Sequence, residues 1–128
     1  MPELHVFEYA TVRVVPRVER EEFVNVGVIL LCQRLQFLQT QLLLPETRLR
    51  ALAGEHLHLG ELTERLRSFE RICRGQPDGG IIGQLNLAER FRWLTAQRST
   101  VVQTSPVHPG LCVDAAATLT RLVEQLVA

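Results

Sequence analysis

The chain has 128 residues, with 14 basic and 14 acidic side chains and a formal net charge of zero. This length fits a single domain over residues 1–128, and a composition of 46% hydrophobic and 22% charged residues excludes a disordered or fibrous protein. The balanced charge excludes a strongly basic nucleic-acid coat protein, although a local basic patch remains open. Every basic residue is an arginine, which excludes chemistry that needs a lysine Schiff base or a phosphate-loop lysine.

Three strands are predicted in the first third of the chain. Residues 4–15 favour a strand whose core face carries the even-numbered residues Leu4, Val6, Ala10, Val12 and Val14, and whose other face is available for contacts. Residues 23–32 contain an unbroken apolar run, which is typical of a central strand buried on both faces. A tight turn at 33–35 leads into a third strand at 36–44, so we expect an antiparallel meander.

Helical periodicity follows. Pro45 and Gly54 fit the start and the end of a short helix, residues 61–74 form the clearest helix, and residues 87–96 form a third. The glycine-rich segment between the last two is a loop.

A fourth strand at 99–105 is expected to end in an irregular turn that Pro106, Pro109 and Gly110 force, and Asp114 is a natural N-cap for the last helix. The order of elements predicts an α+β fold, in which a meander of three strands gains a fourth strand and the helices pack mainly on one face of the sheet.

The sequence gives no sign of export or membrane insertion. The longest apolar run has seven residues, far below the roughly 20 that a membrane helix needs, and the N-terminus lacks the charged and apolar regions of a signal peptide. Cys32, Cys73 and Cys112 make an odd number and are expected to be reduced, buried thiols. We therefore expect a cytoplasmic protein.

The first candidate patch joins the first two strands. Arg13, Arg17 and Arg20 place three guanidinium groups at one end of the predicted sheet, where they could hold a phosphate or a carboxylate. The alternative is that these arginines pair with Glu21 and Glu22 on a solvated loop. Asn25 needs hydrogen-bond partners if it is buried, and the nearby Gly27 could mark the close approach of a ligand or of another backbone segment.

A second patch combines arginines with aromatic residues. Arg90, Arg92 and Arg98 are interleaved with Phe91 and Trp93, a pattern that can bind phosphates and stack on nucleic-acid bases. Helical spacing directs Phe91 inward, so the alternative is that both aromatic rings belong to the core.

The third candidate is the segment 99–112. His108 lies between two prolines and close to the hydroxyl groups of Ser99 and Ser105, so it is a candidate general base or part of an anion site. The alternative is a turn histidine that bonds to the backbone. No serine-nucleophile motif occurs.

The signal for a metal or a cofactor is weak. The pairs His56 with His58 and His108 with Cys112 have suggestive spacings, but a closed zinc site needs four convergent ligands. No metal and no cofactor are expected.

Residues 8–31, 90–94 and 99–112 together resemble the domain-of-unknown-function family 3037 of small bacterial proteins. The resemblance covers nearly the whole chain and implies a small cytoplasmic protein without an assigned activity. It also suggests a HipA-like kinase as a partner. The matching positions that could face a ligand are Arg13, Arg17, Arg20, Asn25, Gly27, Arg90, Arg92, Arg98, Ser99, Ser105 and His108, and the resemblance gives none of them a catalytic role.

Two hypotheses about function result. The first, which the clustered arginines favour, is a binding or accessory module that uses these side chains to hold a phosphate-bearing ligand or an acidic partner. A role with nucleic acid is left open. The second is a small hydrolase or nuclease-like enzyme, in which His108 is the general base, Glu22 a second acid or base, and arginines stabilise a phosphoryl oxyanion. The second requires His108 and Glu22 to line one pocket with Arg17 or Arg20.

Overall fold

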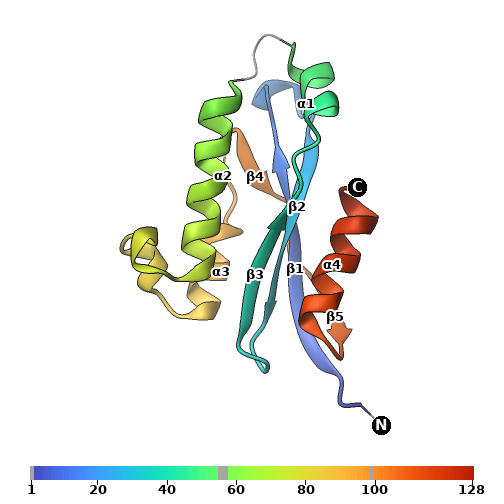
Figure 1. Cartoon of the computed structure of the whole chain (residues 1–128), viewed down its shortest axis with the longest axis vertical. Helices are drawn as coiled ribbons and strands as arrows, with labels where there is room; N and C mark the ends of the chain where they lie inside the picture. The colour runs from blue at the N-terminus through green and yellow to red at the C-terminus, as the bar shows by residue number, and fades with distance from the viewer. Residues whose placement is uncertain (1, 55–57, 99) are drawn as a thin grey trace.

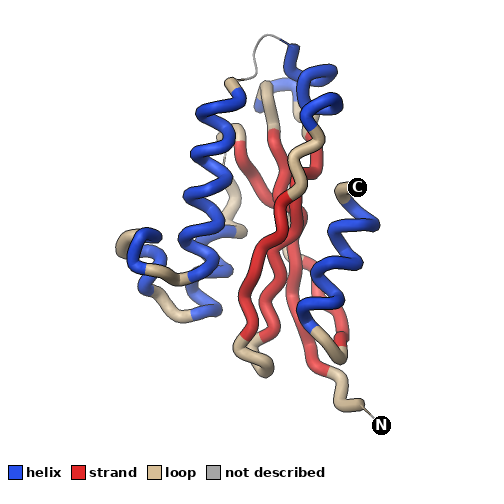
Figure 2. Tube along the Cα trace, viewed as in Figure 1, coloured by secondary structure: helices blue, strands red, loops and turns tan. Residues whose placement is uncertain are grey.

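An antiparallel sheet with helices on both of its faces makes up the fold (Figure 1, Figure 2). The computed structural model describes residues 2–54, 58–98 and 100–128. The described strands are β1 (His5–Val14), β2 (Val24–Cys32), β3 (Phe37–Leu42), β4 (Val102–Thr104) and β5 (His108–Cys112). The described α-helices are α1 (Glu46–Ala53), α2 (Leu59–Arg74), α3 (Leu87–Leu94) and α4 (Ala115–Leu126). The predicted α+β fold is therefore confirmed.

Strand β1 organises the sheet. The order is β3-β2-β1-β4, and β5 pairs with β1 on the same side as β4 but nearer its start. The predicted meander of β1, β2 and β3 is confirmed, because both β1–β2 and β2–β3 are antiparallel. Strand β2 lies between two others and is buried on both faces, as its apolar run predicts.

A bulge in β2 switches the faces of that strand. Val12 pairs with Gly27 but the next residue, Arg13, pairs with Asn25, so that Val26 is the extra residue. In a regular strand Val26 and Ile29, three positions apart, would point to opposite faces. The bulge reverses the alternation between them, so both belong to the same core. Gly27 lies opposite Leu42 of β3 in the same sheet, and a Cβ there would come within 2.6 Å of the Gln41 carbonyl oxygen. The close neighbour of Gly27 is thus another backbone segment, one of the two options for this residue.

Two hydrophobic cores lie on opposite faces of the sheet. One contains residues of α1, α2 and α3, including Leu49, Leu66 and Phe91, whereas the other contains Leu119, Leu122 and Val123 of α4. Three helices therefore share the predicted main face, and α4 covers the other face. Among the described residues, no helix combines the length and the apolar character that a membrane crossing requires.

The predicted core face of β1 is only partly correct. Ala10, Val12 and Val14 are fully buried, but Leu4 is 59% and Val6 is 64% exposed. The core that α1, α2 and α3 share includes the second half of β1 and not these two residues. Their exposure shows that the helical layer does not reach the start of the strand.

The prediction of an irregular turn at Pro106, Pro109 and Gly110 is wrong for the last two residues, which lie in β5. Proline is tolerated there because β5 is an edge strand that pairs with β1 alone, so a missing N–H on its outer side costs no ladder bond. Gly110 is required by packing, since a Cβ at this residue would lie 2.4 Å from the ring of Phe7.

The helix boundaries follow the sequence signals closely. Pro45 and Gly54 flank α1 as predicted, and the Asp114 side chain caps α4 by accepting a hydrogen bond from the backbone N–H of Ala117 at 3.1 Å. Helix α2 begins two residues earlier than predicted, at Leu59, and ends at Arg74. The predicted glycine-rich loop contains two short 3-10 turns, η3 (Pro77–Gly79) and η4 (Ile82–Gln84).

Candidate functional site

Arg13 is a partly buried cation that stacks on an aromatic ring. Its guanidinium lies 3.9 Å from the centre of the Phe23 ring, and Nη2 donates a hydrogen bond to Oγ1 of Thr11 at 3.3 Å. Its Nε is buried without a hydrogen-bond partner. Burial lowers the pKa of this guanidinium. Among the described residues, no carboxylate lies within ion-pair distance of Arg13.

Strand pairing brings the first and third candidate segments together. Arg13 of β1 is paired with Asn25 of β2 on one side and with Gln103 of β4 on the other. Two residues earlier, the Thr11 N–H donates to Oγ of Ser105 at 2.9 Å. Residues directly opposite each other in adjacent strands point to the same face of a sheet. We refer to Thr11, Arg13, Phe23 and Asn25 as the Arg13 face, which lies on the side of the sheet that carries α4.

Asn25 connects this face to the last helix. Its Nδ2 donates a hydrogen bond to the carbonyl oxygen of Leu126 at 3.1 Å, at the C-terminal end of α4. Its Oδ1 is buried without a partner. The expectation that a buried Asn25 must find partners is therefore met for the amide nitrogen and not for the oxygen. An unpaired acceptor lies opposite the unpaired donor of Arg13.

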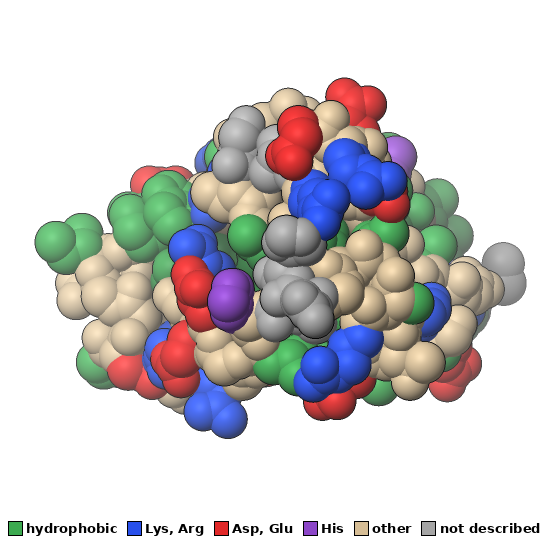
Figure 3. Space-filling view, turned by 90° about the horizontal axis from the view of Figure 1, so that it is seen from above, with side chains coloured by type: hydrophobic (Ala, Val, Ile, Leu, Met, Phe, Trp, Pro, Cys, Tyr) green, Lys and Arg blue, Asp and Glu red, His purple; other side chains and the backbone are tan. Residues whose placement is uncertain are grey.

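Arg17 and Arg20 lie beyond the end of β1, outside the Arg13 face. The Arg20 Nε is 2.6 Å from the Glu22 carboxylate, in a pair whose side chains are 57% and 40% exposed. Both arginines and Glu22 border a small hollow against Leu52 of α1. The view down on the end of the molecule that carries α1 shows cationic and anionic side chains intermixed (Figure 3). For Arg20, the alternative of pairing with a neighbouring glutamate is the one observed.

His108 and Glu22 do not meet. His108 is exposed on β5 opposite Tyr9, and the two rings lie 5.4 Å apart. Glu22 precedes Val24, which pairs with Val14 on the other side of β1. Tyr9 and Val14 are five positions apart along the strand, a distance of roughly 17 Å. The geometric condition for the enzyme hypothesis is therefore not fulfilled.

Arg90 and Arg92 form no common patch. Arg90 Nη1 donates to the Leu85 carbonyl oxygen at 2.6 Å, and its guanidinium lies against Gly75 at the end of α2, where a Cβ would be 2.8 Å from Cζ. A cation at this position interacts favourably with the C-terminal end of the helix dipole. Arg92 is exposed on α3 and its side chain points away from Arg90, since residues two apart on a helix lie about 200° apart.

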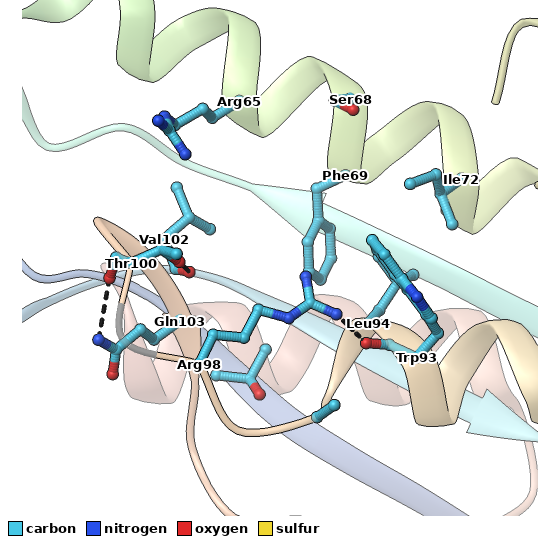
Figure 4. Close-up of a pocket in the computed structure, with 12 residues that line it drawn as sticks. Arg65, Ser68, Phe69, Ile72, Trp93, Leu94, Arg98, Thr100, Val102 and Gln103 are labelled. Atoms are coloured by element: carbon cyan, nitrogen blue, oxygen red, sulfur yellow. Dashed lines mark hydrogen bonds between the residues drawn. The ribbon is translucent and has the colours of Figure 1, made fainter. Parts of the chain in front are cut away.

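Arg98 and Trp93 line a separate hollow between α2 and β4 (Figure 4). The Arg98 guanidinium lies 4.1 Å from the centre of the indole ring and also donates a hydrogen bond to the Trp93 carbonyl oxygen. Burial lowers the pKa of Arg98, as it does for Arg13. Trp93 is 39% exposed, so the alternative that it belongs wholly to the core is wrong, whereas Phe91 is buried as predicted.

The remaining predicted residues play structural parts or lie outside the described residues. Ser105 is buried, and its Oγ both accepts from Thr11 and donates to the Pro106 carbonyl oxygen at 2.9 Å. Ser99 and His56 lie outside the described residues. Across residues 2–54, 58–98 and 100–128, no three histidine, cysteine, aspartate or glutamate side chains gather as a metal site would require.

Sequence reasoning missed Phe23 and Arg65 as parts of these sites. For Phe23 a signal existed, because it lies two residues before Asn25 on the face that carries Arg13. Arg65 gave no such signal, since it lies one helix turn after Glu61, with which it forms an ordinary surface pair at 3.4 Å. Nothing local in the sequence places Arg65 beside a hollow.

The fold and these sites define a small α+β protein with a partly buried arginine on the sheet face that carries α4. The chain belongs to the family described as "Protein of unknown function (DUF3037)", whose model matches residues 9–127. No curated protein and no solved structure matches the chain. The matched residues include all three sequence segments that carry the resemblance, apart from Glu8.

Proposed function

We propose that this chain is a binding module, without catalysis of its own, that receives an anionic side chain of a partner protein at Arg13. One observation carries the proposal. Arg13 carries a half-buried guanidinium that no described carboxylate neutralises. Such a group is costly to bury unless a partner compensates it, and an external carboxylate would do so.

The geometry around Arg13 suits a bidentate contact. A guanidinium carries five N–H donors in a rigid fork, and Thr11 takes one of them in the structure. Stacking on Phe23 fixes the plane of the fork before any ligand arrives. Less side-chain entropy is then lost on binding, so the contact gains affinity and a fixed orientation.

The surroundings favour a protein as the source of the anion. Phe23 is 46% exposed beside Arg13 and offers an apolar contact next to the charged one. Aromatic and arginine side chains in close proximity are typical of the residues that dominate protein interfaces. The HipA-like kinase that the family resemblance suggests is the first partner to test.

Co-expression with a HipA-like kinase, followed by affinity capture and calorimetric titration, tests this proposal. We expect Arg13→Gln to weaken binding about tenfold or more, and Arg13→Lys to recover only part of the loss because the fork is absent. Arg92→Gln, which removes an exposed arginine from α3, is the matched control and should bind like the parent. A hexaglutamate peptide serves as a second probe. If the kinase and the peptide both bind Arg13→Gln as well as they bind the parent, the proposal is wrong.

A further inference from the structure

The hollow between α2 and β4 has an apolar floor. Its volume is about 200 Å³, and the core residues Phe69, Ile72 and Leu94 form its base. Trp93 from the end of α3 and Val102 from β4 close two of its sides. Elements that are far apart in the sequence thus meet around one cavity (Figure 4).

Two arginines line this hollow. Arg98 reaches across it toward the rings of Trp93 and Phe69, and Arg65 approaches from α2 (Figure 4). No carboxylate among the described residues lies within ion-pair distance of Arg98. Among the described residues, Arg65 pairs only with Glu61, at 3.4 Å, and the two side chains are 49% and 63% exposed. Such surface pairs contribute little, so Arg65 remains available to a ligand.

The composition of the lining sets this hollow apart from two larger ones. None of the residues described as lining it is acidic, and the hydroxyl groups of Ser68 and Thr100 add polar partners. A hollow of about 500 Å³ near the N-terminus contains Glu8 together with Arg34, which is paired with Glu3 at 3.2 Å. A third, of about 330 Å³, contains Glu70 with Arg74. In both of these an acidic residue belongs to the lining, whereas Glu61, the partner of Arg65, does not line the hollow between α2 and β4.

We propose that the hollow lined by Arg65, Trp93 and Arg98 binds a small organic oxyanion, a carboxylate or a phosphate ester on a short apolar body. The guanidinium groups bind the oxyanion, and the body rests on Phe69 and the indole ring. This site is distinct from the Arg13 face. Arg13 points to the side of the sheet that carries α4, whereas Phe69 and Leu94 belong to the core on the other side.

The volume limits the size of the ligand. The hollow has a volume of about 200 Å³. Pockets for drug-sized molecules are typically about 300–1,000 Å³. A single ring with one charged group is therefore the expected size of the part of a ligand that the hollow takes up.

The only tryptophan of the chain reports on this site directly. Fluorescence titration of the full chain with benzoate, phenyl phosphate, inorganic phosphate and benzyl alcohol separates charge from apolar contact. We expect saturable quenching by benzoate or phenyl phosphate, with the tighter of the two identifying the oxyanion. Inorganic phosphate lacks the apolar body and should bind at least about tenfold more weakly than the tighter aromatic oxyanion. Benzyl alcohol lacks the charge and should be weakened at least as much.

Variants show whether the arginines bind the probe. Arg98→Gln and Arg65→Gln should each raise the Kd about tenfold, whereas Arg92→Gln and Arg13→Gln should change it less than twofold. Because Arg98→Gln alters the surroundings of the indole, calorimetry provides the Kd for that variant. If none of the probes binds saturably, the proposal is wrong. It is also wrong if benzyl alcohol binds as tightly as the charged aromatic probes, or if the Kd is unchanged in both the Arg98 and the Arg65 variant.

Discussion

Gly27→Ala tests whether close packing of β2 against β3 determines the residue at this bulge. A Cβ at this position would lie 2.5 Å from Cδ2 of Leu42 and 2.6 Å from the carbonyl oxygen of Gln41. The leucine methyl group can rotate away, but the carbonyl is fixed in the β2–β3 ladder, where Gln41 pairs with Val28. The strand itself must therefore shift. Overpacking of this kind typically costs about 1–3 kcal/mol, and we expect Gly27→Ala to fall in the upper half of that range because the obstacle is backbone.

Gly60→Ala is the matched control for this substitution. Gly60 lies in the first turn of α2, and a Cβ there would have no atom within 4 Å. Alanine has the higher helix propensity and reduces the entropy of the unfolded chain, so the variant should gain up to about 1 kcal/mol. Urea unfolding followed by circular dichroism provides both values. A Gly27→Ala protein within about 0.5 kcal/mol of the parent would refute the reasoning, whereas failure to fold agrees with it.

Two further predictions concern α4 and the buried thiols. Asn25→Ala removes the hydrogen bond to the Leu126 carbonyl, so it should cost about 1 kcal/mol and speed hydrogen exchange in the last turn of α4; unchanged exchange there would contradict this. Burial raises the pKa of Cys73 from 9.0 to about 12. The folded state thus keeps a proton that the unfolded state releases. The free energy of unfolding should therefore decline between about pH 9 and pH 12, by at most about 1.4 kcal/mol per pH unit from this group. Cys73→Ala should lack this component in urea titrations from pH 8 to 11, and an identical slope would exclude Cys73 as the cause.

The meander and the helices were predictable because their signals are local. Alternation in β1, the apolar run in β2 and the cap at Asp114 each depend on neighbouring residues alone. The continuous burial predicted for β2 also implied a cover on both faces, which α1, α2 and α3 provide on one face and α4 on the other. Strand β5 was missed because proline and glycine usually end strands, and only the position at the sheet edge makes them acceptable there.

The site residues were predictable in type but not in arrangement. The odd-numbered positions of β1 placed Arg13 on the correct face of the sheet. The contacts of its guanidinium, however, depend on where Thr11, Phe23 and Asn25 lie in the folded chain. Arg90 and Arg92 are close in sequence, yet the helix separates them. The contact between Thr11 and Ser105 joins residues 94 positions apart, a separation at which no local pattern carries information.

The central position of β1 has a consequence for how the protein is made. Its first partner, β2, follows after a short connection, but its other edge is covered by β4 and β5, near the end of the chain. During synthesis the ribosome releases the meander first, so that edge stays unpaired until more than 80 further residues, from Val14 to Val102, have emerged. Open strand edges promote association with other chains, and contacts at such long range form slowly. Synthesis of β4 and β5 covers this edge and so opposes aggregation of the nascent chain. Truncation before β4 would leave the edge permanently exposed.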